Sequence, residues 1–152
     1  MKKTVLIALL CSSLVIPGLF AQADSLATLE ITFVGIRSNK GLIVVGINDS
    51  PKGWPRKPMM DFFFEKAGLK NGSLTVEISE LKYGTYAVSV LDDENSNLEM
   101  DKFLRMPKEG YGFSNDIKKK LSAPNFEECA FKIDKASKKI SIEIGYPGKD
   151  EE

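Results

Sequence analysis

The sequence predicts an all-β fold, an antiparallel β-sandwich of about seven short strands with Greek-key connections. Three observations lead to this fold class. Apolar residues recur with a period of two, segments rich in Gly, Asn, Asp and Ser separate the apolar runs, and no strong helical period is present. These are features of short strands that bury one face and expose the other.

The predicted strands are, in order, 29–34, 41–47, 62–65, 73–79, 86–90, 128–134 and 138–146. In the first strand, Leu29, Ile31 and Phe33 point to one side, because successive side chains of a strand alternate between faces. The second strand is nearly continuous in apolar residues, which indicates that both of its faces are covered. The third strand has the least regular pattern, and apolar and polar residues alternate along the remaining four strands.

Turn-forming residues separate these strands at 38–41, 70–72 and 134–137. The last turn lies between two well-patterned strands, so the sequence predicts that 128–134 and 138–146 form a C-terminal hairpin.

A tyrosine pattern supports the sandwich. Leu81-x-x-Gly84-x-Tyr86 is similar to the pattern at sandwich corners, where the tyrosine hydroxyl bonds the backbone a few residues upstream. An ordinary strand tyrosine is the alternative interpretation.

The N-terminus has the three parts of a secretory signal peptide. Lys2 and Lys3 precede an apolar stretch, and Ala21-Gln22-Ala23 forms a cleavage site between small residues. Polar and helix-breaking residues interrupt the apolar stretch, so we expect no transmembrane anchor after signal cleavage. An acylated lipoprotein beginning at Cys11 is the alternative, but Leu10 occupies the preceding position, where a small residue is normal.

Signal cleavage near Ala23 would divide the chain into a signal peptide, 1–23, and a single β-sandwich domain, 24–152, located in the periplasm or secreted. Two long loops, 48–60 and 92–127, interrupt the regular spacing of the strands. The mature chain would keep one cysteine, Cys129, expected on the same side of its strand as Phe131 and Ile133. It is either a small buried residue or a bridge to a partner.

Composition excludes several classes of function. The 152-residue chain contains no histidine, so it cannot supply a Ser-His-Asp triad, a Cys-His dyad or a His-ligated zinc or haem site. Its formal net charge is zero, and about −2 without the signal peptide, so no basic field favours nucleic acid.

The acidic part of the second loop has the spacing of a calcium site. Asp93, Asn95, Asn97 and Asp101 place oxygens at alternate positions, and Ca²⁺ binds six to eight oxygens. The EF-hand pattern needs Gly at position six and Glu at position twelve, but both positions counted from Asp93 hold leucine. A calcium loop and a solvated acidic turn therefore both stay open, and no other cofactor is predicted.

Aromatic residues in the two loops indicate a contact surface. Trp54, the only tryptophan, lies among prolines and basic residues, and Tyr111, Phe113 and Asn115 lie beside glycines. Aromatic residues of this kind are frequent binding anchors, and capping one end of the core is the alternative role of Trp54. The triple lysine Lys118–Lys120 is expected to be a solvated face.

The chain resembles an exported bacterial family known as domain of unknown function 2141. The resemblance covers about residues 28–146 and rests on an ordered set of motifs: Gly84-x-Tyr86, Asp93-Glu94-Asn95-x-Asn97, Asp101, Phe103-Leu104-x-x-Pro107-x-Glu109-Gly110-Tyr111-Gly112-Phe113-Ser114-Asn115 and Pro124-x-Phe126-x-x-Cys129-Ala130-Phe131. It implies export and an immunoglobulin-like or prealbumin-like sandwich, and it supplies no established activity.

The chain departs from the family pattern at the acidic turn, where the family has His-Asp-Glu-Asn-Gly-Asn-Gly. Asp92 replaces the histidine, and Ser96 and Leu98 replace the glycines. Glycine at such positions implies a positive φ, which Ser96 and Leu98 tolerate poorly. The change at Asp92 makes a histidine-dependent role for this member untenable.

Three functional hypotheses follow. The leading one is a non-catalytic binding module of the periplasm or cell envelope, whose candidate surface is Trp54, Tyr111, Phe113 and Asn115, and whose partner is an envelope protein or a glycan. The second is a glycosidase-like hydrolase that uses carboxylates among Asp93, Asp101 and Glu109. The third is a purely structural envelope protein.

Overall fold

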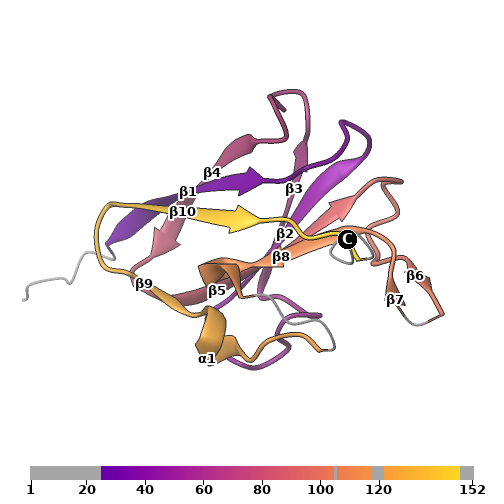
Figure 1. Cartoon of the computed structure of the whole chain (residues 1–152). Coiled ribbons are helices and arrows are strands. Elements are labelled where there is room, and N and C mark those ends of the chain that lie inside the picture. Colours follow the sequence, from indigo (N-terminus) through magenta and orange to yellow (C-terminus); the bar gives the residue numbers. More distant parts are fainter. Residues whose placement is uncertain (1–24, 105, 118–121, 148–152) are drawn as a thin grey trace, which may run out of the picture.

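The computed structural model describes residues 25–104, 106–117 and 122–147, most of them in strands or turns (Figure 1). The predicted signal peptide, 1–23, and the triple lysine, 118–120, lie outside these residues. The elements are β1 (Leu26–Val34), β2 (Leu42–Asn48), β3 (Met60–Glu65), β4 (Leu74–Lys82), β5 (Gly84–Asp93), β6 (Lys102–Phe103), β7 (Met106–Pro107), β8 (Gly110–Phe113), the 3₁₀ turn η1 (Ser114–Asp116), α1 (Phe126–Cys129), β9 (Phe131–Ile133) and β10 (Ser137–Glu143).

These strands form two principal sheets and a small hairpin. The first sheet has the order β10-β1-β4, and the second contains β3-β2-β5-β8, with β9 paired to the beginning of β5. Strands β6 and β7 pair with each other. The three-stranded sheet crosses the upper part of Figure 1, above β5 and β8. An all-β fold with several antiparallel pairings is therefore confirmed.

The main core forms from alternate residues of both principal sheets. In β1, Leu29, Ile31 and Phe33 are fully buried, while the residues between them are partly exposed. The same cluster takes Val76 and Ile78 from β4, and it includes buried residues of β2, β5 and β10. Each apolar face of a strand is removed from water in this way, which is the main stabilising term of the fold.

Most of the predicted strands lie where the structure has strands. The predicted strand 128–134 is wrong in its first part, because Phe126–Cys129 forms α1 and only Phe131–Ile133 is a strand. The nearly continuous apolar run becomes β2, which lies between β3 and β5, and the least regular run becomes β3. Tyr86 also behaves as predicted: its hydroxyl donates to the carbonyl oxygen of Lys82, four residues upstream, at 2.9 Å. This hydrogen bond ties the end of β4 to the start of β5.

The predicted C-terminal hairpin is wrong. Strand β9 pairs with β5, and β10 pairs with β1, in parallel, so the chain crosses from one sheet to the other between Ile133 and Ser137. Ile133 and Ile142 still bury in the shared core. The parallel β1–β10 pairing also departs from the wholly antiparallel arrangement that the sequence predicted.

The segment 92–127 has more local structure than a loop. It contains the end of β5, the β6–β7 hairpin, β8, η1 and α1. Cys129 ends α1 instead of continuing the strand that holds Ile133, and it is fully buried in a second, smaller cluster. The short helix begins at Asn125, whose capping box with Glu128 satisfies backbone donors that a helix start leaves open.

Candidate functional site

The outer face of the five-stranded sheet carries apolar side chains in register across four strands. Val44 of β2 is paired with Phe63 of β3 on one side and with Leu91 of β5 on the other. Leu91 is in turn paired with Tyr111 of β8. Residues directly opposite each other project from the same face of a sheet, so these four side chains form one row. We call them the apolar row.

The apolar row is accessible. Phe63 is 52% exposed, and the other three side chains are half-buried. The neighbouring residues of each strand point the other way, as Ile43 and Val45 do when they enter the core. A contiguous exposed apolar patch is a common mark of an interaction site.

An aromatic cluster continues the same face beyond the apolar row. Its buried members are Ala87, Phe113, Phe126 and Cys129, and Trp54, Tyr111, Ile117 and Ala130 pack around them, half-buried. Tyr111 belongs to both groups, because its ring centroid lies 5.9 Å from that of Phe113. The row and the cluster therefore form one continuous apolar surface.

Trp54 brings the first long loop onto this cluster. Its ring centroid lies 5.9 Å from that of Phe113 and 6.1 Å from that of Phe126. The indole Nε1 donates to the carbonyl oxygen of Pro124 at 2.8 Å. Buried indole N–H groups need such a partner, so Trp54 packs the loop onto the cluster while its side chain stays half-buried.

The four residues predicted as a contact surface have different environments. Trp54, Tyr111 and Phe113 come together, but Phe113 is only 8% exposed and lies inside the cluster. Asn115 lies at its border, where its amide donates to the carbonyl oxygens of Glu128 at 3.0 Å and Ala130 at 3.1 Å. The accessible part of the predicted surface is therefore Asn115, which is exposed, with the half-buried Tyr111 and Trp54.

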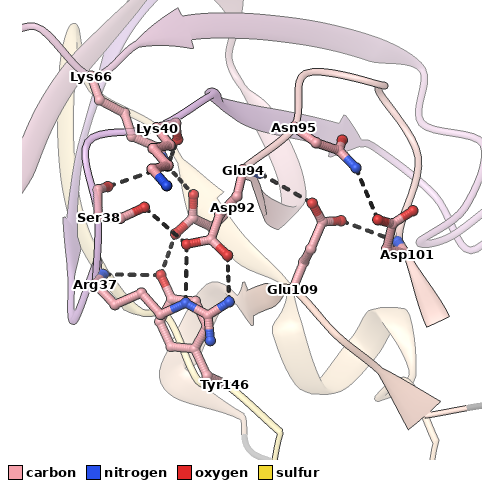
Figure 2. A network of polar contacts seen from close by, with 10 residues as sticks. All are labelled: Arg37, Ser38, Lys40, Lys66, Asp92, Glu94, Asn95, Asp101, Glu109 and Tyr146. Atoms are coloured by element: carbon pink, nitrogen blue, oxygen red, sulfur yellow. Dashed lines mark hydrogen bonds and ion pairs between the residues drawn. The ribbon is translucent and has the colours of Figure 1, made fainter. Parts of the chain in front are cut away.

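The residues predicted to bind calcium form a compact acidic turn, 93–101 (Figure 2). The carboxylate of Asp93 is fully buried and accepts hydrogen bonds from the backbone N–H groups of Asn97 at 3.2 Å and Leu98 at 2.8 Å. The carboxylate of Asp101 accepts from the side-chain amide of Asn97 at 3.1 Å. It also accepts from the side-chain amide of Asn95 at 2.9 Å, as Figure 2 shows. Each carboxylate thus has donors from within the turn.

To hold Ca²⁺, these oxygens would have to exchange their present hydrogen bonds for metal contacts. Within the described residues, no group of three or more His, Cys, Asp or Glu side chains is arranged to hold a metal ion. Calcium binding stays a prediction.

Backbone geometry explains the glycines that the resembled family has here. Ser96 has φ 60° and Leu98 has φ 63°, both in the left-handed region that glycine adopts most easily. The chain therefore keeps the turn geometry although neither glycine is present.

Glu109 connects the acidic turn to β8. It is buried, and its two carboxylate oxygens accept from the backbone N–H groups of Glu94 and Asp101, each at 3.1 Å. Burial raises the pKa of Glu109, and these hydrogen bonds oppose that shift. The carboxylates proposed for hydrolysis, Asp93, Asp101 and Glu109, are thus all acceptors of hydrogen bonds that hold the turn together.

Sequence reasoning missed a buried ion-pair network beside this turn (Figure 2). The Lys66 ammonium contacts the carboxylate of Asp92, and both side chains are 0% exposed. The hydroxyl of Tyr146 donates to the other oxygen of Asp92, and Lys66 also donates to the carbonyl oxygen of Lys40 at 2.5 Å. We call Lys66, Asp92 and Tyr146 the buried network.

A signal for the buried network is present in the sequence. Asp92 continues the inward-facing series that begins with Val88 and Val90. Lys66 follows Phe62 and Phe64 at the same spacing, and Tyr146 follows Ile142 and Ile144. A polar residue at an inward position requires a buried hydrogen-bonding partner. Three such residues at strand ends are therefore expected to be partners of one another.

An exposed ion pair extends the buried network to the surface. Arg37 lies over the ring of Tyr146, 4.3 Å from its centroid, and its guanidinium binds the carboxylate of Glu94. Ser38 donates to the same carboxylate at 2.9 Å. The pKa of Glu94 is lowered to about 2, mainly because its carboxylate accepts the hydrogen bond from Arg37. The pKa of Tyr146 is raised, mainly because its hydroxyl is buried.

These contacts define the class of protein: an all-β protein whose buried charges are engaged in structural contacts and whose five-stranded sheet carries one outward-facing apolar row. Asp61 and Glu65 of β3 flank this row on the same face. Residues 31–141 match the family described as uncharacterised protein conserved in bacteria (DUF2141). The chain belongs to this family. Neither the search of curated proteins nor the search of solved structures found a match. Among the residues that the structure describes, no helix has the length and apolarity needed to cross a membrane.

Proposed function

We propose that the chain is an exported, non-catalytic binding module of the bacterial cell envelope. Its two principal sheets form an immunoglobulin-like or prealbumin-like Greek-key sandwich, and its outer sheet face binds an apolar segment of an envelope protein. The apolar row is the single observation that carries this proposal. Export is supported by the sequence features of residues 1–23.

The composition of the row favours a protein over a glycan. Val44, Leu91 and Phe63 have no polar side-chain atoms with which to bind sugar hydroxyls. An apolar partner segment would bury these side chains and bring Tyr111 into the contact, where its hydroxyl can make a hydrogen bond at the rim.

The polar groups of the molecule favour a non-catalytic role. Asp93, Asp101 and Glu109 accept hydrogen bonds from the acidic turn, and two of them bind backbone N–H groups. A general acid or nucleophile for glycoside hydrolysis must face the substrate, whereas these carboxylates organise their own loop.

A pull-down from an envelope extract tests the proposal. Phe63→Ser removes the most exposed member of the row, and it should reduce capture of the partner by about tenfold, because a few large apolar anchors carry most of the binding energy. Leu26→Ser is the matched control, since Leu26 is 48% exposed but belongs to β1 of the other sheet. If both variants capture the partner as the parent chain does, the apolar row is not the binding surface.

A further inference from the structure

The Lys66–Asp92 pair of the buried network brings an amine and a carboxyl group together in a place that excludes water. Both side chains are 0% exposed, and the ammonium contacts the carboxylate directly (Figure 2). The two residues come from different parts of the sheet, because Lys66 follows β3 and Asp92 lies in β5, with β2 between these strands. An ion pair in such a place is a weak source of stability, since desolvation cancels much of the attraction. It is a favourable arrangement for a reaction between the two groups.

The contacts of Lys66 orient its nitrogen toward Asp92. The Nζ group donates to the carbonyl oxygen of Lys40 at 2.5 Å and to that of Ser38 at 3.4 Å. Each of these oxygens accepts one N–H, so an uncharged amine in this position directs its lone pair at the carboxyl group of Asp92. Uncharged lysine amines attack carbonyl carbons in many enzymes.

Tyr146 is placed to assist at the carboxyl group. Its hydroxyl oxygen accepts from the backbone N–H of Arg37 at 3.1 Å, and its own proton is donated to the second oxygen of Asp92. Burial raises the pKa of Tyr146, so the hydroxyl keeps this proton. A fixed donor at a carboxyl oxygen stabilises the negative charge that develops there when a nucleophile attacks the carbon.

Proximity allows the two groups to react without prior activation of the carboxyl group. Amide formation between a free amine and a free acid is slow in water, but groups held in contact reach effective molarities of about 10⁵–10⁸ M. Transfer of one proton within the pair gives the uncharged amine and acid, and loss of hydration lowers the cost of this transfer. The exclusion of water also protects the product from hydrolysis.

We propose that Lys66 and Asp92 condense to form an intramolecular isopeptide bond. After one proton passes from Nζ to the carboxylate, the Nζ lone pair forms a bond to Cγ of Asp92. The electrons of the C=O bond move to the oxygen that Tyr146 binds. They return as the C–OH bond breaks, and the hydroxyl leaves with one proton from Nζ as water. One ammonium and one carboxylate thus give one amide and one water molecule, and no oxidant, reductant or other reactant is needed.

The isopeptide bond would fix the edge strand of the binding surface. Strand β3 is the last strand of the five-stranded sheet on its side and carries Phe63 of the apolar row. Leu42 of β2 is paired with Glu65 and with Asp93, so the bond would cross the end of β2 and join its two neighbours. The edge strand could then not separate from the sheet when a partner is bound or pulled away.

Mass spectrometry of the purified protein tests this proposal. The full chain is expressed in bacteria, and its N-terminus is identified by peptide mapping. The intact parent protein should be lighter than its sequence requires by the mass of one water molecule. After proteolysis, the peptides that contain Lys66 and Asp92 should be recovered as one branched peptide. The exposed Lys139–Glu30 pair, 2.9 Å apart, is the internal control and should give two separate peptides, because water solvates both groups.

Two variants assign the roles of the residues. Lys66→Arg keeps a cation beside Asp92 but removes the reactive amine, so it should have the full mass of its sequence. Tyr146→Phe keeps the ring and removes the donor, so pulse-labelled protein should lose water at least about tenfold more slowly than the parent does.

The parent protein alone decides the main point, whether or not the variants fold. The proposal is overturned if the parent has the full mass of its sequence, or if the branched peptide joins a different pair. A Tyr146→Phe variant that loses water as fast as the parent would overturn the part assigned to the tyrosine. None of these results depends on the binding of a partner, so the proposed binding function is tested separately.

Discussion

At the scale of single residues, the buried network is the least expected feature of the molecule. A lysine and an aspartate that are both 0% exposed have lost their hydration, and only good geometry and further hydrogen bonds compensate for this loss. Tyr146 and the carbonyl oxygen of Lys40 provide those hydrogen bonds. The network therefore holds four separate chain segments in one arrangement: the loop before β2, the end of β3, the end of β5 and the C-terminal segment.

Lys66→Met should destabilise the fold strongly. The variant leaves the Asp92 carboxylate buried without its cation, which typically costs about 3–5 kcal/mol of unfolding free energy. Urea denaturation measures the loss. Lys132→Met is the control, because the Lys132–Asp134 pair is exposed and should contribute less than about 1 kcal/mol. If the two variants unfold at the same urea concentration, the buried network does not stabilise the protein as described.

At the scale of elements, the turn between β4 and β5 shows how one side chain fixes a connection. The Tyr86 hydroxyl reaches back to Lys82, and its ring lies against Gly84, where an added Cβ would be 3.2 Å from the ring. Glycine at this position lets the ring approach the backbone, so the tyrosine and the glycine work together.

Tyr86→Phe should lower the free energy of unfolding by about 1 kcal/mol, because it removes this hydrogen bond and keeps the ring. Denaturant melts measure the change. Tyr83→Phe is a suitable comparison, since the side chain of Tyr83 is 40% exposed and water can replace its interactions. Equal stability of Tyr86→Phe and the parent chain would contradict the corner role.

The elements also show what the sequence can predict. Alternation located β1, β4 and β5, because a strand with one buried face has a strong local pattern, and a nearly continuous apolar run located β2. It did not identify the partners of β9 and β10, since pairing depends on which sheet a strand enters and not on its own residues. Elements of two to four residues, such as β6 and α1, are too short to show a period.

The candidate site was predictable in part for the same reason. Trp54, Tyr111 and Phe113 do gather, as the aromatic character of the two loops indicated. Phe63 was not singled out, because three consecutive phenylalanines leave the inward and outward positions of β3 ambiguous. Only the register with Val44 shows that Phe63 is the outward one.

At the scale of the whole molecule, structural and interaction roles are separated. The main core lies between the two principal sheets, and the buried network closes one end. On the outer face of the five-stranded sheet, the apolar row faces outward. The fold leaves this row accessible, and the proposed binding function of the protein is assigned to it.

Photo-crosslinking in living bacteria tests the central claim, that the outer face of the five-stranded sheet is the binding surface. A photoreactive benzoylphenylalanine replaces Phe63 in one variant and Leu26 in another, since both positions are about half exposed on different sheets. The account predicts a discrete protein adduct from position 63 and none from position 26. No adduct from position 63, or the same adducts from both positions, would contradict it.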